Sequence, residues 1–372
     1  TTKIKKVIVS VSNDLASDQR VKKVCDTLVK CNFNVTLIGR ELNNSRPIER
    51  PYSTKRLRLF FNKGFLFYFE YNLRLFFLLM FKKFDVYHAN DLDTLLPMWI
   101  VSSVRRKNLV YDTHEYFTGV PEIQDRFIVK KVWKTIEKLI FPRLNHVFTV
   151  NSSIANLYFD DYQINPKILR NLPSNITIQK IRSKNELGLP IDKPIVILQG
   201  SGINIHRGSE ELVEAIATQE KFFLCIVGTG DVIENLKTRC NDDDLKSKVL
   251  FVDPLPYQMM MQYTLNSDVG VSLDKNNNIN YQFSLPNKIF DYSKAEIPYV
   301  STNLIEIKKI VDEFHTGVLI NSLKTEEILN GLEKAIDLSK SDNYLKNIKK
   351  MNSDLNWEKE SEVLTATYKS FK

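Results

Sequence analysis

The stretch Ser284-Leu-Pro-Asn-Lys-Ile-Phe-Asp-Tyr292 decides how the fold of this chain is interpreted. The apolar run at residues 269–273 before it is typical of a buried strand. Ser284 is a preferred N-cap residue, and Pro286 is tolerated only in the first turn of a helix, so the sequence predicts a helix that begins at Ser284. A buried strand followed by a capped helix is the repeating unit of an α/β sheet.

One face of this predicted helix suits a phosphorylated ligand. The first amides of a helix carry a partial positive charge and bind anions, and Lys288 adds a full charge in the first turn. Asp291 lies four residues after Asn287 and three after Lys288, so all three share one face of the helix. An anion at the helix mouth and a vicinal diol one turn deeper would fit that face, as in a nucleoside diphosphate. The alternative is an ordinary capped helix with no ligand.

Length, composition and charge limit the classes of protein to consider. A chain of 372 residues, 43% hydrophobic and 26% charged, predicts two globular domains. The formal charge of +8 favours an acidic partner, which leaves nucleic acid, an anionic membrane or a phosphorylated substrate. The four cysteines have no metal-ligand spacing, and no cluster of acids and histidines has it either, so we expect no metal. The lysines near the start precede only a short strand, so we expect no signal peptide and a cytoplasmic protein.

The first half opens as a doubly wound α/β domain. Residues 7–11 predict a strand, residues 12–20 a polar loop, and the apolar spacing from Val21 a helix. Ligands of such sheets bind where strands end, so Asp18 and Arg20 are candidates for the wall of a binding cleft. A solvated loop is the alternative for both residues.

Polar residues also follow the next predicted strands. His88 and Asp91 end the strand at residues 85–91, and His114 and Glu115 end the strand at residues 109–115. Two of the five histidines therefore fall at adjacent strand ends with acids beside them. A single histidine is more often structural than catalytic, but two that converge on one rim favour a functional role for at least one.

Residues 55–84 are unusually aromatic and basic. Eleven of the 25 residues from Phe60 to Phe84 are Phe or Tyr, and seven Lys or Arg stand against one acid, Glu70, between Lys55 and Lys83. Residues 64–81 are long enough to cross a bilayer, but the polar residues in their middle argue against it. We expect a helix that lies on an anionic membrane surface. A core helix with snorkelling lysines is the alternative, whereas the excess of Leu and Phe argues against nucleic-acid binding.

The second half repeats the α/β pattern. Residues 174–192 read as a linker, which predicts domains at residues 1–175 and 176–356. The strand at residues 194–200 leads into a turn with Gly200, Gly208 and the cation Arg207, and a second turn, Gly228-Thr-Gly230, follows the strand at residues 222–227. Glycines allow close approach of the backbone to a ligand. Both turns and the Ser284 stretch follow strands of one sheet, which predicts a single anion-binding edge.

These residues resemble a known family. The motifs Ser17-Asp-Gln-Arg20, His88-Ala-Asn-Asp91, Tyr111-Asp-Thr-His-Glu115, Gln199-Gly with Arg207-Gly208, Gly228-Thr-Gly230 and residues 284–292 are similar to those of the retaining GT-B glycosyltransferases of the family-four group, which serve surface polysaccharide and glycoconjugate synthesis. The resemblance covers nearly the whole chain. It implies two Rossmann-like domains facing across a cleft, with residues 357–372 crossing back to the first as a helix.

The resemblance also implies roles for particular residues. Arg207 and Lys288 would hold the diphosphate of a UDP- or GDP-linked sugar, Asp291 the ribose hydroxyls, and His114 the transferred sugar near its reacting carbon. The nucleotide-sugar would be a substrate, no metal would be needed, and the acceptor would be lipid-linked or a glycan at the inner face of the membrane. The donor-binding set is Gly200, Ser201, Arg207, Gly208, Gly228, Gly230, Ser284, Asn287, Lys288 and Asp291, and the acceptor-side set is Asp18, Arg20, His88, Asp91 and Glu115.

Two positions depart from the family pattern. Ser201 stands where the family often has a basic residue, and Phe283 replaces the first acid of a pair spaced eight apart, of which Asp291 is the second. Two other functions therefore stay open. One is a GT-B epimerase or inverting transferase with Asp91 or Glu115 as its base. The other is a two-domain protein that binds a sugar nucleotide without chemistry.

Overall fold

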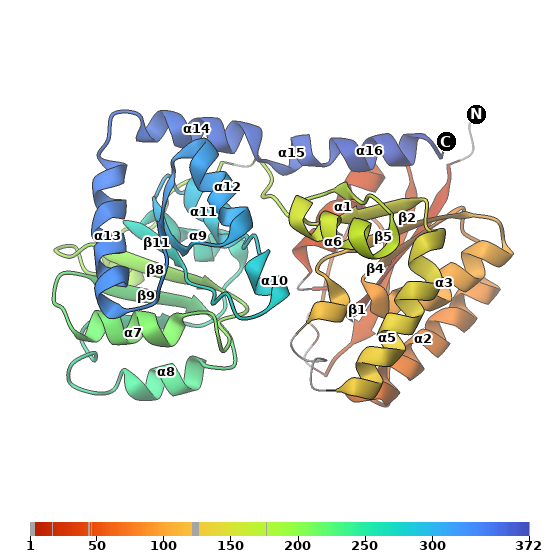
Figure 1. Cartoon of the computed structure of the whole chain (residues 1–372), viewed down its shortest axis with the longest axis horizontal. Coiled ribbons are helices and arrows are strands. Elements are labelled where there is room, and N and C mark those ends of the chain that lie inside the picture. The colour runs from red at the N-terminus through yellow and green to blue at the C-terminus, as the bar shows by residue number, and fades with distance from the viewer. Residues whose placement is uncertain are drawn as a thin grey trace. The chain divides into compact units, whose positions relative to one another are not determined.

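The computed structural model describes residues 4–16, 18–43, 45, 47–120, 126–175 and 177–371 and divides the chain into two compact units. Unit 1 comprises Thr1–Asn171 together with Trp357–Lys372, and unit 2 comprises Leu172–Asn356 (Figure 1). Each unit contains one parallel sheet between helices, which confirms the α/β class predicted from the sequence. The predicted boundary after residue 175 lies four residues beyond the division seen in the structure.

The sheet of unit 1 has seven strands in the order β3-β2-β1-β4-β5-β6-β7, and all described pairs are parallel. The strands are β1 (Lys6–Asp14), β2 (Asn34–Glu41), β3 (Ser53–Arg58), β4 (Val86–Asn90), β5 (Asn108–Thr113), β6 (His146–Thr149) and β7 (Lys167–Ile168). The order reverses between β1 and β4. In open α/β sheets such a reversal opens a crevice at the carboxyl ends of the strands, where ligands bind.

The helices of unit 1 are α1 (Gln19–Lys30), α2 (Gly64–Phe81), α3 (Leu92–Val104), α5 (Phe127–Ile140), α6 (Ser152–Tyr162), α15 (Trp357–Glu360) and α16 (Glu362–Lys369). Two short 3-10 helices, η1 (Phe117–Gly119) and η2 (Phe141–Arg143), flank α5. Strand β3 ends at Arg58. The amides of Phe60 and Phe61 donate to the Glu70 carboxylate of α2 instead of to a neighbouring strand.

The last residues of the chain complete the core of unit 1. The indole Nε1 of Trp357 donates to Oγ1 of Thr27 in α1 at 3.0 Å, and Leu364 and Tyr368 are fully buried against the apolar face of β1 and α1. The Tyr368 ring packs edge-on against Phe33. Residues 357–372 therefore return to the first unit, as the sequence predicted.

The sheet of unit 2 has six strands in the order β10-β9-β8-β11-β12-β13, again with all described pairs parallel. The strands are β8 (Ile195–Gly200), β9 (Phe223–Gly228), β10 (Val249–Val252), β11 (Val269–Ser272), β12 (Tyr299–Thr302) and β13 (Gly317–Ile320). Val196 and Leu198 enter one apolar core, and Ile195 and Ile197 enter the core on the other face. A strand buried on both faces reads as a continuous apolar run, which is why these strands were visible in the sequence.

Helices cover both faces of the second sheet (Figure 1). They are α7 (Ser209–Ala217), α8 (Ile233–Arg239), α9 (Tyr257–Leu265), α10 (Ile279–Gln282), α11 (Lys288–Lys294), α12 (Ile305–Phe314), α13 (Thr325–Ser339) and α14 (Tyr344–Asp354), with the 3-10 helix η3 (Asn185–Leu187) before β8. The strand order reverses between β8 and β11. The residues that follow these two strands therefore lie at the ligand-binding edge of this sheet.

Candidate functional site

In unit 2, the turns after β8 and β9 are joined backbone to backbone. The amide of Thr229 donates to the carbonyl of Gly200, and the amide of Ile203 donates to the carbonyl of Thr229, each at 3.0 Å. Gly228 has a φ of +136°, and a Cβ there would collide with the Gly200 carbonyl. These glycines are thus needed for the turns to pack on each other. That these glycines also contact a ligand stays a prediction.

Gly208 brings Arg207 to the end of the neighbouring strand. Its φ of +72° favours glycine, and a Cβ would collide with the carbonyl of Leu273 directly after β11. This close approach sets Nη1 of Arg207 2.7 Å from Oδ2 of Asp274, whose carboxylate is fully buried. The guanidinium also lies over the ring of Tyr281, 4.4 Å from its centroid. Burial opposes the charge, but Asp274 outweighs it and raises the pKa of Arg207.

Lys288 is a second cation beside the same acid. It is partly buried, and its ammonium has no hydrogen bond or ion pair among the residues that the structure describes. Burial lowers the pKa of Lys288; Asp274 opposes this shift and Arg207 adds to it, so the three charges belong to one cluster. We call Arg207, Asp274 and Lys288 the cation cluster. It lies at the reversal point between β8 and β11.

The predicted start of the helix at Ser284 is wrong. Helix α11 begins at Lys288, and the short helix α10 precedes it, capped by the side chain of Asn278. Pro286 favours an extended conformation at Leu285, which separates the two helices. Ser284 lies near the cation cluster, with its Oγ 3.5 Å from Oδ2 of Asp274, while Asn287 and Ser201 are exposed.

Asp291 is held by protein groups one turn after Lys288. The hydroxyl of Tyr257 donates to one carboxylate oxygen at 2.7 Å, and Nε2 of Gln199 donates to the other at 3.1 Å. Oε1 of Gln199 in turn accepts from the Thr264 hydroxyl at 2.6 Å. Burial and the neighbouring Asp291 charge both raise the pKa of Tyr257, which keeps its proton on the phenol. The orientation of the Asp291 carboxylate is therefore set before any ligand arrives.

In unit 1, Asp91 and His114 form a polar pair at the carboxyl ends of the neighbouring strands β4 and β5. The Asp91 carboxylate accepts from the backbone amide of His114 at 2.8 Å, and its Oδ2 lies 3.2 Å from the ring Nδ1. The ring Nε2 lies 3.2 Å from Oδ1 of Asn90 and 3.7 Å from Oδ2 of Asp112. Burial opposes protonation of His114, but the two acids outweigh it and raise its pKa to about 9.

The backbone of Asp91 is strained. Its φ of +57° with a ψ of 166° is a conformation that residues other than glycine rarely adopt, at a cost of roughly 1–3 kcal/mol. Strain of this kind is kept where the surroundings enforce it, often at functional sites. Here the hydrogen bonds to His114 enforce it, so the pair is a rigid unit at the sheet edge.

Arg20 and His88 do not line a cleft, contrary to the prediction. Arg20 is buried and holds the Asp112 carboxylate by two hydrogen bonds of 2.6 and 3.1 Å, and it also donates to the carbonyl of Leu169. His88 is fully buried within β4, where Nδ1 lies 2.7 Å from the Tyr368 hydroxyl. Burial lowers the pKa of His88 to about 4, so its ring is neutral at neutral pH. Both residues stabilise the core behind the pair.

The remaining acceptor-side residues have different surroundings. Asp18 is the N-cap of α1 and accepts from the amide of Val21 at 3.0 Å, while Glu115 is exposed. Ser17, in the first quoted motif, lies outside the described residues. Within the described ranges, no group of three or more acids, histidines or cysteines is arranged to hold a metal ion.

Several polar residues at these edges were missed in the sequence. Asp274 directly follows the apolar run at residues 269–273, so the same strand-end argument that selected Asp91 would have found it. Tyr257 carried no local signal, because its partner Asp291 is 34 residues away. Gln199 was quoted in a family motif, but its contact with Asp291, 92 residues away, was not foreseen. Asp93 in α3 was also missed; burial and the nearby Asp91 raise its pKa to about 7.

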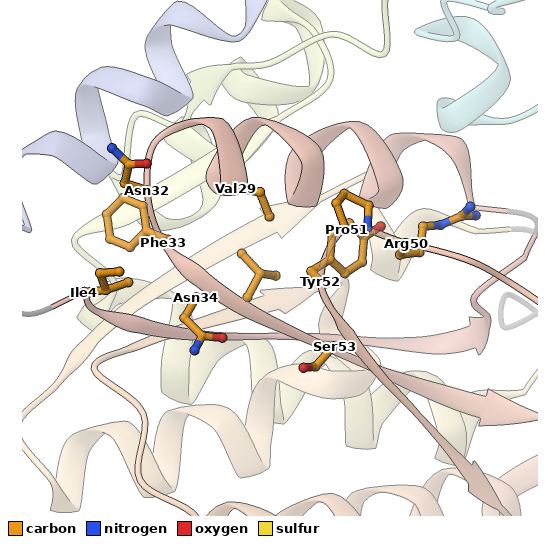
Figure 2. A pocket seen from close by; sticks show the side chains of 10 residues that line it. Ile4, Val29, Asn32, Phe33, Asn34, Arg50, Pro51, Tyr52 and Ser53 are labelled. Atoms are coloured by element: carbon orange, nitrogen blue, oxygen red, sulfur yellow. The ribbon is translucent and has the colours of Figure 1, made fainter.

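A separate pocket of about 720 Å³ lies at the amino ends of β2 and β3 (Figure 2). Phe33, Tyr52 and Ser53 are among the residues that line it, with Arg50 at one side. This is the edge of the sheet opposite to His114 and Asp91. Since ligands of parallel sheets bind at the carboxyl ends, we assign the pocket no part in the site.

Known proteins match both halves of the chain. Residues 18–173 match the family Glycosyltransferase Family 4, and residues 179–351 match Glycosyl transferases group 1. An uncharacterized glycosyltransferase of Methanocaldococcus jannaschii is 22% identical over 217 residues, which are 55% of this chain. The chain spans about half (52%) of the length of that curated relative.

Solved structures share the fold over nearly the whole chain. Sucrose-phosphate synthase from Thermosynechococcus elongatus is 17% identical, with a TM-score of 0.76 and 98% of each chain covered. HepE of Anabaena, in complex with UDP and glucose, is 14% identical, with a TM-score of 0.77 over 98% of this chain and 100% of that one. The two parallel-sheet units and the solved structures show the GT-B fold, and the family matches over residues 18–173 and 179–351 show that the chain belongs to the glycosyltransferases.

Proposed function

We propose that this glycosyltransferase moves a hexose from a UDP- or GDP-linked donor to a lipid-linked or glycan acceptor, with retention at the sugar and without a metal ion. The donor nucleotide binds at the carboxyl edge of the unit 2 sheet. The acceptor is met at the cytoplasmic face of a membrane, where the product enters the synthesis of a polysaccharide or glycoconjugate.

The cation cluster is the observation that carries this proposal. Two cations share one buried acid, and the ammonium of Lys288 has no hydrogen-bond or ion-pair partner among the described residues. A diphosphate supplies the negative charge that this arrangement lacks. When the bond to the sugar breaks, charge grows on the departing diphosphate, and preorganised cations stabilise it. This stabilisation needs no Mg²⁺, because the protein itself provides the positive charge.

Helix α11 carries both Lys288 and Asp291, the residue that we assign to the ribose of the donor. Asp291 lies one turn deeper, with its carboxylate fixed by Tyr257 and Gln199. A carboxylate in this position can accept from the two hydroxyls of a ribose. The HepE structures, which hold UDP or UDP-glucose, support a nucleotide-sugar donor for a chain of the same fold.

His114 is the residue we assign to the transferred sugar. Its raised pKa makes the ring an imidazolium at neutral pH, and Asp91 holds the ring in place. A cationic donor can hydrogen-bond to a sugar hydroxyl or to an oxygen on which charge develops. Asp91 is engaged by the amide and the ring of His114, which makes it a poor candidate for the free carboxylate base that an epimerase would need.

The membrane placement rests on α2. This helix is apolar and long enough to cross a membrane by length and composition, yet only 22% of it is buried inside the structure. Together with the basic excess of residues 55–84, this supports docking on an anionic surface.

A panel of UDP-, GDP- and dTDP-sugars tests the donor proposal. Thermal shift reports binding, and slow hydrolysis of the donor reports chemistry. We expect one nucleotide class to stabilise the wild type and not the Lys288→Ala variant, whereas Lys294→Ala at the other end of α11 keeps the response. If no nucleotide-sugar binds, or if both variants respond like the wild type, the cation cluster is not the donor site. Coupling constants of the product sugar, measured by NMR, then distinguish retention from inversion.

A further inference from the structure

Helix α2 has two apolar stripes on opposite faces. Phe67, Tyr71, Leu75 and Leu79 recur every four residues and are buried in unit 1. A second stripe, offset by two residues, is exposed to between 43 and 85%; it consists of Phe65, Phe69, Leu73, Phe77 and Phe81. A surface helix of a globular domain normally carries polar residues on its outer face. The outer stripe of α2 therefore needs a partner that the fold of unit 1 does not supply.

Helix α5 repeats this arrangement. Trp133, Glu137 and Ile140 face inward and are buried. Ile128, Val132 and Leu139 are 77, 42 and 46% exposed and recur at helical spacing on the outer side, and Phe127 in the first turn is 77% exposed. In the sequence, the apolar residues of α5 look like an ordinary amphipathic pattern, and only the structure shows which of them are exposed.

The two helices are neighbours. The ring of Tyr68 in α2 packs edge-on against Trp133 in α5, with their centroids 5.2 Å apart, and α3 contacts both helices. Tyr71 of α2 and Trp133 of α5 are buried within unit 1, so the exposed stripe of each helix faces away from the residues that it packs on. Contiguous apolar patches of this kind mark interaction surfaces on soluble domains.

The charges around the two stripes select the partner. Residues 60–84 and 126–143 contain ten lysines and arginines against two acids. Neither acid is available to repel an anionic surface: Glu137 is fully buried, and Glu70 accepts from Arg74 and from the amides of Phe60 and Phe61. The exposed cations include Lys63, Lys82 and Lys83 beside α2 and Lys131 and Lys138 in α5. Apolar stripes with a basic rim complement an anionic lipid surface.

We propose that α5 is a second membrane-contact helix, which docks with α2 on an anionic bilayer through Phe127, Ile128, Val132 and Leu139. This inference rests on the proposed function only for the membrane placement of α2, and it does not depend on the donor or the chemistry.

Both helices lie on the bilayer and do not cross it. The hydroxyl of Tyr71 donates to the carbonyl of Val11 in β1, and Nδ2 of Asn72 donates to the carbonyl of Asp93 in α3 at 2.8 Å. Crossing would pull α2 away from the sheet and break these bonds in a medium that cannot replace them. Docking leaves the fold unchanged and removes the outer stripes from water.

Co-sedimentation of the full chain with vesicles tests the proposal. The vesicles contain phosphatidylcholine alone or mixed with phosphatidylglycerol. The α5 variant carries Ile128→Gln, Val132→Gln and Leu139→Gln, and the α2 variant carries Phe69→Gln, Leu73→Gln and Phe77→Gln. The matched control replaces three exposed isoleucines of unit 2, Ile181→Gln, Ile191→Gln and Ile305→Gln. We expect the α5 variant to lose at least about tenfold in binding to anionic vesicles, since each apolar side chain adds to the transfer free energy, and the control to bind like the wild type.

A fluorescent probe gives a second measurement that does not depend on a loss of binding. An environment-sensitive dye is attached to Ile128→Cys in a Cys31→Ser background, because the other three cysteines are buried. Anionic vesicles should shift its emission to the blue, while the same dye on Ile191→Cys should not respond.

The outcomes separate this inference from the proposed function. If the α5 variant binds like the wild type and the probe stays silent while the α2 variant is weakened, α5 is not a contact and the membrane placement by α2 stands. If the wild type ignores anionic vesicles at low salt, both the placement and the inference are wrong. An equal loss in the unit 2 control also overturns the inference, because binding would then lack a defined surface.

Discussion

Asp274 holds Arg207 with a 2.7 Å contact between Oδ2 and Nη1, and its second oxygen, Oδ1, has no hydrogen-bond partner among the described residues. Asp274 thus orients the guanidinium of Arg207 and holds it next to Lys288. In the proposed function, a diphosphate that approaches this cluster meets an arginine whose position is already set, so little entropy of the Arg207 side chain is lost on binding.

Arg207→Ala should weaken donor binding. A charged hydrogen bond contributes roughly 1.5–3 kcal/mol, so affinity for the nucleotide should fall by about tenfold to more than a hundredfold. Titration calorimetry with UDP and GDP measures the loss. Arg239→Ala is the matched control and should leave nucleotide affinity unchanged, because this partly exposed arginine of α8 pairs with Glu214 and Asp244. Unchanged affinity in both Arg207→Ala and Lys288→Ala would put the diphosphate elsewhere.

Lys288 should make nucleotide affinity sensitive to alkaline pH. Burial lowers its pKa, so the ammonium loses its proton at a lower pH than an ordinary lysine, and binding weakens as the pH rises through that value. Lys288→Arg should bind with little change over the same range, because an arginine stays charged. Calorimetry across neutral to alkaline pH checks this. A wild type and a Lys288→Arg variant with parallel pH profiles would show that the titrating group is another residue.

Removal of metal ions should leave turnover nearly unchanged. The cation cluster supplies the charge that Mg²⁺ or Mn²⁺ supplies in metal-dependent transferases. Incubation with EDTA should change the rate by less than about twofold, the tolerance we set for a stabilisation provided by the protein alone. The assay is donor turnover before and after chelation. An activity that disappears with EDTA and returns with either ion would contradict the electrostatic account.

His114→Ala should reduce turnover far more than nucleotide affinity. His114 belongs to unit 1, whereas the cation cluster belongs to unit 2. Loss of an oriented contact that forms in the transition state lowers the rate by about a hundredfold or more. UDP or GDP affinity should hold within experimental error. His114→Gln retains a hydrogen-bond donor and should recover part of the rate. Parallel losses of rate and affinity would make His114 a structural residue.

His88 should make unit 1 sensitive to acid. Its pKa of about 4 in the folded chain lies below the usual value for histidine, so the unfolded chain binds more protons between these two values. Stability should therefore be complete above pH about 6.5 and should fall by on the order of 3 kcal/mol as the pH drops through 4. Urea unfolding at several pH values measures this. In His88→Gln this pH dependence should be reduced; an unchanged slope would assign it to other groups.

The alternation of apolar strands and helices was readable because it is local. The extent of α2 and the strand predicted at residues 194–200, which is β8, follow from residues close in the chain. The start of α11 was not readable, because Ser284 is a good cap by residue type, yet a separate short helix, α10, ends just before it and α11 begins only after Pro286, at Lys288.

The site residues divide in the same way. Lys288 and Asp291 could be placed on one helical face from their spacing. The burial of His88 could not, because its partner Tyr368 is 280 residues away, and Arg20 likewise pairs with Asp112 across 92 residues. Long-range partners of this kind turn candidate surface residues into core residues without any local sign.

The return of residues 357–372 to unit 1 has a consequence for how the chain is made. Strand β1 is synthesised before unit 2, but Trp357 and Tyr368, which close the core over α1 and β4, are synthesised after it. Unit 2 is continuous in sequence and can fold as soon as it leaves the exit tunnel. Unit 1 therefore lacks part of its core throughout the synthesis of unit 2, and it can complete that core only after unit 2 has been made.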